Sequence, residues 1–338
     1  MRNKKPVKKS PKPIVTVIDW KSGPVVNGDT SVEREVLGNT AEVRYALCDD
    51  EADFNKDICE SDVILLWQNA NVTEDGISRL KKCRTIVRNG VGYDSVDIAA
   101  AGRAGISVCN VPDYGTEEVA DHAIALTLAL TRQLFPLDAE AKSLGWKLHT
   151  AHKIRRLREL TFAIVGLGRI GTAVALRAKA LGLQVVFYDP YVSNGVEKAI
   201  GIRRVRSLDV LLKQADVLTL HTPLTAETRY LIGARELALM KPTAYVVNTS
   251  RGPVIEKRAI FDALRKGKLW GAALDVVEDE PLRTKEEAAT PNLIVTCHAA
   301  FCSVEAKEEM RRTAARITRQ AVLFEPLDNL VNGQFLRK

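Results

Sequence analysis

Short apolar runs, many of them rich in β-branched residues, alternate along the chain with longer amphipathic stretches. Such runs, bounded by turn residues, predict buried strands, and apolar positions that recur every three or four residues predict helices. In the first third of the chain we expect strands at 14–18, 63–67, 85–88 and 106–109, and helices at 73–80 and 96–104. This alternation favours a parallel sheet covered by helices on both faces.

A second series of the same kind starts at residue 161. Its predicted strands are 161–165, 184–188, 217–220, 244–247, 272–276 and 293–296, and its predicted helices are 169–181, 208–213, 234–240, 256–266 and 303–324. The chain of 338 residues is long enough for two domains, each with its own core.

A long helical pattern begins after the turn-rich residues 111–115. Thr116 is expected to cap this helix, and Glu117 and Glu118 suit the positive end of the helix dipole. The helix should run to about Arg132. It is apolar on most faces, which predicts burial between domains or subunits.

Several features predict a cytoplasmic protein. The apolar run at 123–130 is too short and too closely flanked by charge to span a bilayer, and no apolar segment of the signal-peptide kind stands at the start. The six cysteines form no C-x-x-C pair, which favours reduced thiols over a disulfide framework.

Histidines and cysteines do not cluster as ligand sets, so no metal site is expected.

Almost all of the net charge of +7 belongs to the first twelve residues, which carry six Lys and Arg residues and no acid. Without them, 43 of the 49 basic residues stand against 42 acidic ones. A nucleic-acid-binding body needs its own basic face, so this function is disfavoured. We interpret residues 1–12 as a disordered, solubilising tail. A weak contact of the tail with RNA, DNA or anionic lipid stays open.

Residues 166–171 (GLGRIG) follow an apolar strand and open a helical pattern, which is the context that a dinucleotide fingerprint requires. Gly166 permits the tight turn, Gly168 lets the backbone approach a pyrophosphate, and Gly171 allows close packing of helix on strand. The expected phosphate contacts are the backbone N–H groups of Arg169 and Ile170.

Asp189 ends the next predicted strand, at the spacing of the acid that binds the adenosine ribose diol. A carboxylate there repels a 2′-phosphate, so NAD is favoured over NADP. The alternative is a glycine-rich turn that only packs a helix. The combination of strand, turn, helix and acid disfavours that alternative.

Arg251, Glu280 and His298 each follow a predicted strand or its short extension. In parallel sheets, ligands bind beyond the carboxyl ends of the strands. Arg251 suits bidentate binding of a carboxylate, and His298 suits proton transfer near neutral pH, oriented by Glu280. Taken singly, each residue has an ordinary structural explanation. Their shared position behind the fingerprint favours reduction of a 2-keto acid or oxidation of a 2-hydroxy acid.

Four segments closely resemble the D-isomer-specific 2-hydroxyacid dehydrogenases, and the likeness covers nearly the whole chain from Pro13: residues 161–171, 247–253, 273–281 and 298–300. Within that family the chain is most similar to the C-terminal-binding-protein branch. The residues that carry this finer likeness are 108–112, 117–121, 188–191, 298–300 and 309–311.

The resemblance implies two similar doubly wound parallel-sheet α/β domains with a cleft between them. One is a flavodoxin-like substrate domain, made of residues 13–112 and 304–338. The other is a Rossmann NAD-binding domain, made of residues 113–303. The resemblance also implies a homodimer through the NAD-binding domain and a small 2-keto or 2-hydroxy acid as substrate.

The resemblance further implies roles for individual residues. Arg251 would anchor the substrate carboxylate, His298 would act as acid and base, and Glu280 would be its partner. Substrate contacts would come from Val91, Gly92 and Tyr93. Besides the fingerprint and Asp189, the cofactor would be lined by Thr116, His221, Thr222, Pro223, Asn248, Thr249, Asp275 and Ala300, with Asp275 at the nicotinamide carboxamide.

Three positions depart from the pattern of the family or of the branch. Cys297 stands where the family usually has Pro, and we expect an inert buried thiol there rather than a redox-sensitive one. Phe301 and Cys302 stand where the branch usually has Trp and Tyr. Phe301 is either an apolar wall of the substrate pocket or a residue of interdomain packing, and both interpretations stay open.

The leading hypothesis is therefore an NAD-dependent D-2-hydroxyacid dehydrogenase. The rival hypothesis is an NAD(H)-sensing corepressor-like binding protein, which the branch resemblance allows. The near-neutral body and the complete catalytic trio favour the enzyme. A catalytically dead relative conflicts with the presence of all three residue types.

Overall fold

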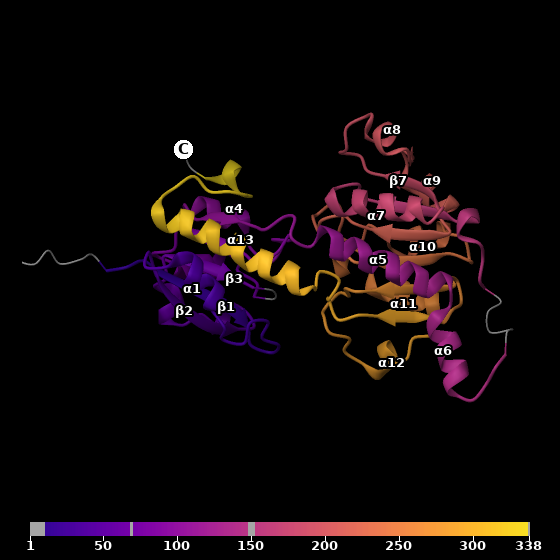
Figure 1. The fold of residues 1–338 in the computed structure, drawn as a ribbon, viewed down its shortest axis with the longest axis horizontal. Helices are drawn as coiled ribbons and strands as arrows, with labels where there is room; N and C mark the ends of the chain where they lie inside the picture. The colour runs from indigo at the N-terminus through magenta and orange to yellow at the C-terminus, as the bar shows by residue number, and fades with distance from the viewer. Residues whose placement is uncertain (1–10, 68–69, 148–152, 337–338) are drawn as a thin grey trace, which may run out of the picture. The chain divides into compact units, whose positions relative to one another are not determined.

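The computed structural model describes residues 11–67, 70–147 and 153–336, and the chain divides into two compact units (Figure 1). One unit comprises residues up to Tyr114 together with those from Val304 onward, and the other comprises Gly115–Ser303. Ten of the twelve residues of the predicted basic tail lie outside the described residues.

The first unit is built on a five-stranded parallel sheet with the order β2-β1-β3-β4-β5, which is the flavodoxin order. Its strands are β1 (Ile14–Trp20), β2 (Glu42–Cys48), β3 (Val63–Leu66), β4 (Thr85–Arg88) and β5 (Ser107–Cys109). Its helices are α1 (Ser31–Leu37), α2 (Lys56–Cys59), α3 (Glu74–Arg79), α4 (Ile98–Arg103) and α13 (Val304–Leu323).

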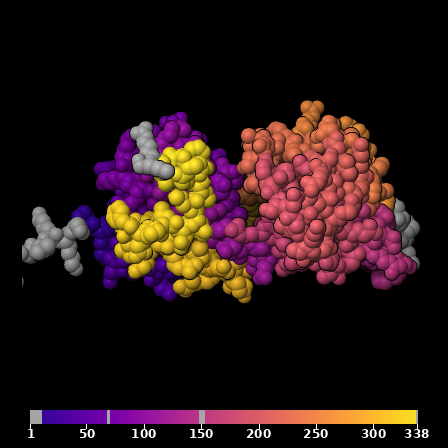
Figure 2. Space-filling model, turned by 90° about the horizontal axis from the view of Figure 1, so that it is seen from above, coloured from indigo at the N-terminus to yellow at the C-terminus, as the bar shows by residue number. Residues whose placement is uncertain are grey.

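Helix α13 returns the chain from the second unit to the first and packs on α1, β3 and β4. Figure 2 shows this C-terminal segment, in yellow, lying against the indigo and purple residues of its unit. Met310 and Ile317 are each 1% exposed, and each such burial stabilises the fold by about 1.5–3 kcal/mol. Arg311 donates two hydrogen bonds, of 2.7 and 2.9 Å, to the buried carboxylate of Glu33 on α1.

The second unit contains a seven-stranded parallel sheet with the order β12-β11-β10-β9-β6-β7-β8. Read from β8, its first six strands follow the Rossmann order, with β12 added at the edge. The strands are β6 (Thr161–Val165), β7 (Gln184–Tyr188), β8 (Arg203–Arg204), β9 (Val217–Leu220), β10 (Tyr245–Asn248), β11 (Gly271–Leu274) and β12 (Leu293–Val295).

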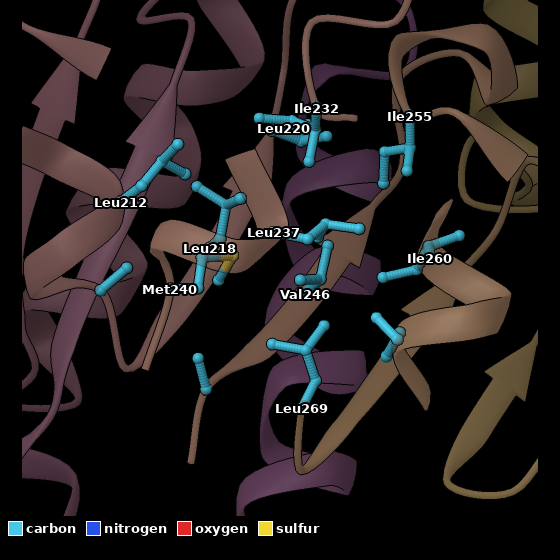
Figure 3. Close-up of a cluster of buried hydrophobic side chains, with 14 of the residues drawn as sticks. Leu212, Leu218, Leu220, Ile232, Leu237, Met240, Val246, Ile255, Ile260 and Leu269 are labelled. Carbon is cyan, nitrogen blue, oxygen red and sulfur yellow. The ribbon is translucent and has the colours of Figure 1, made fainter. Parts of the chain in front are cut away.

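Helices cover both faces of this sheet, because alternate strand residues point to opposite sides. Ile164 belongs to the core cluster under α5 and α7, whereas Val165 belongs to the cluster under α9, α10 and α11. Figure 3 shows residues of the second cluster, among them the strand residues Leu218, Leu220 and Val246 and the helix residues Leu237 and Ile260. The helices are α5 (Thr116–Thr131), α6 (Leu134–Lys142), α7 (Arg169–Ala180), α8 (Val196–Ile200), α9 (Leu208–Gln214), α10 (Ala234–Leu239), α11 (Lys257–Arg265) and α12 (Lys285–Ala288).

The predicted fold class of two parallel-sheet α/β domains is confirmed. One local prediction is wrong: Thr116 does not cap α5, because Gly115 occupies the cap position and no side-chain cap bond forms there. Gly115 has no side chain that could accept a hydrogen bond from the first turn of α5, so this turn relies on Glu117 and Glu118 for its electrostatic complement. No helix among the described residues is long and apolar enough to cross a bilayer.

Candidate active site

His298 and Glu280 form the centre of the candidate site. Glu280 Oε2 lies 2.9 Å from Nδ1 of His298, and both side chains keep part of their surface open to solvent, 23% for the imidazole and 32% for the carboxyl. A carboxylate oxygen can only accept, so Nδ1 is the donor and the ring orientation is fixed by the bond. The edge of the Phe301 ring stands near the imidazole, with 6.4 Å between the ring centroids.

Asp275, at the carboxyl end of β11, holds the turn that carries His298. The backbone N–H of His298 donates to Asp275 O at 2.8 Å, and the N–H groups of Ala299 and Ala300 donate to the Asp275 carboxylate at 2.9 and 3.0 Å. His298 itself has a φ of 54°, a left-handed conformation that costs a non-glycine residue energy unless its surroundings enforce it. The bonds to Asp275 provide that enforcement.

The loop that carries Glu280 is also fixed by side-chain bonds. Arg283 donates from Nε to the carbonyl oxygen of Asp279 at 3.0 Å and from Nη2 to that of Glu280 at 3.2 Å. The backbone N–H of Arg283 in turn donates to Glu287, which forms a capping box with Thr284 at the start of α12. The short helix α12 therefore anchors the loop from its far side.

Arg251 lies in the turn after β10. Asn248, which is 1% exposed, accepts bonds from the N–H and hydroxyl of Ser250 and donates to the carbonyl oxygen of Arg251 at 2.9 Å. A Cβ atom on Gly252 would lie only 2.1 Å from the carbonyl carbon of Val277. The Arg251 turn is thus packed directly on the backbone that leads to Glu280.

The glycine fingerprint has the geometry that a dinucleotide requires. Gly166 has a φ of +90°, and a Cβ on Gly171 would lie 2.0 Å from the carbonyl oxygen of Gly166, so both positions need glycine. At Gly168, by contrast, nothing lies within 4 Å of such a Cβ. Gly168 precedes α7, whose first residues Arg169 and Ile170 present their N–H groups at the positive end of the helix.

Asp189 follows β7 and accepts three backbone hydrogen bonds. Its Oδ2 accepts from the N–H of Leu167 at 2.8 Å, and its Oδ1 accepts from Tyr191 at 2.8 Å and Val192 at 3.2 Å. The carboxylate is therefore fixed beside the fingerprint turn. An ionised carboxylate has about four acceptor positions, so one is left for a hydroxyl donor.

Three buried polar atoms near the carboxyl ends of β9 and β10 have no hydrogen-bond partner among the residues that the structure describes: His221 Nδ1, Thr222 Oγ1 and Thr249 Oγ1. Buried polar atoms are normally satisfied, so these three are free to receive polar groups of a ligand. Burial lowers the pKa of His221 to about 3, which keeps the ring neutral, and its Nε2 lies 2.9 Å from Thr219 Oγ1. These atoms and the open space at Gly168 fit a polar dinucleotide. Pro223, in the same loop, is exposed.

The remaining predicted substrate residues belong to the first unit, in the loop after β4. Val91 is 36% exposed and Tyr93 is 37% exposed. Asn110 donates to the carbonyl oxygen of Val91 at 2.7 Å, which fixes the Val91–Gly92 backbone within its own unit.

Sequence reasoning missed two polar residues at the site, Thr296 and His122. Thr296 Oγ1 donates to Asp275 Oδ1 at 2.5 Å, and His122 Nε2 on α5 lies 3.1 Å from Thr296 Oγ1. Thr296 lies two residues before His298, so its nearness in the sequence could have identified it as a residue of the site. His122 is 174 residues away from Thr296, so no local sequence pattern could have identified it.

The prediction of a buried thiol at Cys297 is wrong. Cys297 is exposed, because the turn directs its side chain outward while the backbone N–H of His298 donates inward to Asp275.

Comparisons with known proteins identify the family of the chain. The family model of the D-isomer specific 2-hydroxyacid dehydrogenase NAD binding domain matches residues 124–300. The chain is 36% identical over 298 residues to D-3-phosphoglycerate dehydrogenase of Methanocaldococcus jannaschii, a match that covers 88% of this chain and 57% of that relative. The chain thus spans little more than half the length of that relative.

A second relative is similar over most of its length. Glyoxylate reductase of Thermococcus litoralis is 37% identical over 283 residues, which cover 82% of this chain and 85% of that protein. Among solved structures, D-lactate dehydrogenase of Aquifex aeolicus, complexed with NAD and lactic acid, matches with a TM-score of 0.85 at 28% identity. This match covers 95% of this chain and 99% of that one.

Proposed function

The chain belongs to the D-isomer-specific 2-hydroxyacid dehydrogenase family, and from this premise we propose that it reduces a small 2-keto acid with NADH. The observation that carries the proposal is the bond of 2.9 Å between Glu280 Oε2 and His298 Nδ1, on a unit with a dinucleotide fingerprint. NADH, when bound, supplies a hydride to the carbonyl carbon of the substrate. The protein's own residues then have to orient the substrate and deliver a proton.

His298 is the proposed proton donor. Because Glu280 occupies Nδ1, the nitrogen that exchanges a proton with the substrate oxygen is Nε2. The protonated imidazole gives this proton to the carbonyl oxygen as the alcohol forms, and the neutral ring regains one from solvent. Glu280 stabilises the cationic ring before transfer and holds it at one angle, which suits a general acid.

Arg251 is the proposed carboxylate anchor, since a guanidinium can bind both carboxylate oxygens in a fixed plane. The backbone of Val91 and Gly92 and the side chain of Tyr93 are proposed to complete the substrate site, with Phe301 as an apolar wall near the imidazole. Fixing the carboxylate also fixes the carbonyl relative to His298, so Arg251 contributes to kcat as well as to KM.

The cofactor is proposed to be NAD rather than NADP. Three backbone N–H groups hold the Asp189 side chain beside the fingerprint turn, where we expect the ribose 2′-group of the cofactor to approach. A carboxylate accepts a hydrogen bond from a hydroxyl but repels a phosphate. His221, Thr222 and Thr249 are proposed to receive polar groups of the dinucleotide, together with the N–H groups of Arg169 and Ile170.

We also propose that the chain belongs to the C-terminal-binding-protein-like branch. This proposal rests on the likeness of residues 108–112, 117–121, 188–191, 298–300 and 309–311. A homodimer through the NAD-binding unit is supported by apolar side chains on and after α6: Leu134, Phe135, Leu144 and Trp146 are 54, 57, 97 and 91% exposed. A cytoplasmic location is supported by the six free cysteines.

A panel of 2-keto acids with NADH and NADPH tests the proposed function. The relatives named above act on phosphoglycerate, glyoxylate and lactate by their names, so the panel includes glyoxylate, pyruvate, hydroxypyruvate and a phosphorylated keto acid. We expect NADH oxidation with at least one of them. Arg251→Ala should raise KM and lower kcat together, while Arg319→Ala, an exposed arginine on α13, should change neither. Tight NAD-dependent capture of a repressor without turnover on any keto acid would instead favour the corepressor.

A further inference from the structure

A continuous chain of polar side chains runs from helix α5 to the turn that carries His298. His122 Nε2 lies 3.1 Å from Thr296 Oγ1, and Thr296 Oγ1 lies 2.5 Å from Asp275 Oδ1. The Asp275 side chain is 1% exposed and that of His122 is 27% exposed. The three residues come from a helix, the end of β12 and the end of β11, so only the folded unit brings them together.

The direction of the hydrogen bonds in this chain can be derived from the number of protons available. The Asp275 carboxylate accepts hydrogen bonds from the N–H groups of Ala299 and Ala300, and it also accepts one from the hydroxyl group of Thr296. A hydroxyl has one proton, so Thr296 Oγ1 can only accept from its other neighbour. His122 must therefore carry a proton on Nε2, and the chain runs from His122 Nε2–H through Thr296 O–H to Asp275.

This directed chain ends on the carboxylate that sets the conformation of His298. Asp275 binds the N–H groups of the two residues directly after His298, while its carbonyl oxygen binds the N–H of His298 itself. Rotation of the carboxylate would release Ala299 and Ala300 together. The bond from Thr296, supported by His122, holds the carboxylate against that rotation.

We propose that His122 and Thr296 are positioning residues for His298, acting through Asp275. This inference rests on the proposed function, because it states that the hydrogen bonds from His122 to Asp275 serve to present His298 to a substrate. Neither residue touches the reacting atoms. Their contribution is to the geometry of proton transfer, where a displacement of about 1 Å can cost on the order of 100-fold in rate.

The first test compares variants that keep or remove each proton. Thr296→Val and His122→Leu remove one link each, and we expect kcat to fall about 10- to 100-fold while KM for the keto acid stays within about two-fold. Thr296→Ser keeps the hydroxyl and His122→Gln keeps an N–H near the position of Nε2, so both should retain most of the activity. Thr127→Val, which removes another buried hydroxyl from α5, one that donates to Ala123 O, is the matched control and should leave kcat unchanged.

Two results of this test would overturn the proposal. One is a kcat within two-fold of wild type in Thr296→Val and His122→Leu. The other is an equal loss in the conservative variants, since that would tie the effect to packing and not to the protons.

A second test needs no turnover. The protein has five histidines, and NMR spectra of protein labelled with ¹⁵N-histidine report on the ring nitrogens of each. Comparison with the spectrum of His122→Gln assigns the His122 signals. We expect the Nε2–H tautomer for His122, and in Thr296→Val a shift of the His298 signals with the NADH dissociation constant within two-fold of wild type. An Nδ1–H tautomer, or unchanged His298 signals, would contradict the positioning chain. Absence of turnover in the wild-type enzyme would refute the proposed function instead, and the spectrum would still decide the direction of the bonds.

Discussion

Glu280 presents its Oε2 to Nδ1 of His298 at 2.9 Å, although the two residues sit on separate loops that are each fixed by other bonds. Both side chains stay partly accessible, with 23% of the His298 side chain and 32% of the Glu280 side chain exposed. A carboxylate in this position both orients the imidazole and stabilises its cationic form.

Glu280→Gln should separate these two effects. The amide oxygen of Gln can still accept from Nδ1–H, so orientation is largely kept, but the negative charge is lost. We expect kcat for keto-acid reduction to fall about 100-fold, because the charge that stabilises the cationic imidazole during proton transfer is lost. The measurement is kcat and KM for the keto acid in wild type and variant. A full-rate enzyme would contradict the assigned role of Glu280.

The fingerprint offers a matched pair of glycine substitutions. Gly171→Ala places a Cβ 2.0 Å from the carbonyl oxygen of Gly166, and we expect a loss of about 1–3 kcal/mol in the free energy of unfolding. Gly168→Ala meets no atom within 4 Å, so stability should be unchanged, but the methyl group should block the close approach of a pyrophosphate. Urea unfolding and NADH titration distinguish the two. The prediction fails if both variants bind NADH like wild type, or if Gly168→Ala is the less stable.

The fold could be predicted because its strands are buried on both faces and read as continuous apolar runs. Most predicted strands agree with the structure to within two residues at each end. Strand β2 was missed because it lies at the edge of its sheet and is only partly buried, so that Glu42 and Arg44 interrupt the apolar pattern. Helix α6 was missed because it has no buried residue and therefore no periodic apolar face.

Local sequence patterns predicted less of the site than of the fold. Glu280 and His298 were predicted together because both follow strands of one parallel sheet, whose carboxyl ends share an edge. The partners of Asp275 could not be predicted, since the contact between His122 and Thr296 depends on the tertiary packing of α5. The exposure of Cys297 also depends on the left-handed conformation of its neighbour His298, which no composition rule predicts.

Asp189 should control the choice between the two nicotinamide cofactors. Asp189→Asn keeps an oxygen that can accept from the N–H of Leu167, and it removes the charge that repels a 2′-phosphate. We expect kcat/KM for NADPH to rise at least 10-fold relative to that for NADH, since one tenfold step corresponds to about 1.4 kcal/mol. Steady-state kinetics with both cofactors measure the ratio. An unchanged ratio would mean that selectivity arises elsewhere in the site.

His221 should make the stability of the protein depend on pH. Burial lowers its pKa from 6.5 to about 3, so between these values the unfolded chain binds a proton on this ring that the folded chain does not. Stability attributable to His221 is therefore present above about pH 6.5 and is lost as the pH falls toward 3, by up to about 1.4 kcal/mol per pH unit. His221→Gln should flatten the dependence of the free energy of unfolding on pH between 4.5 and 6.5, where urea unfolding measures it. Thr222→Val, an adjacent change without a titrating group, should keep the wild-type slope, and an equal slope in His221→Gln would show that the ring titrates normally in the folded protein.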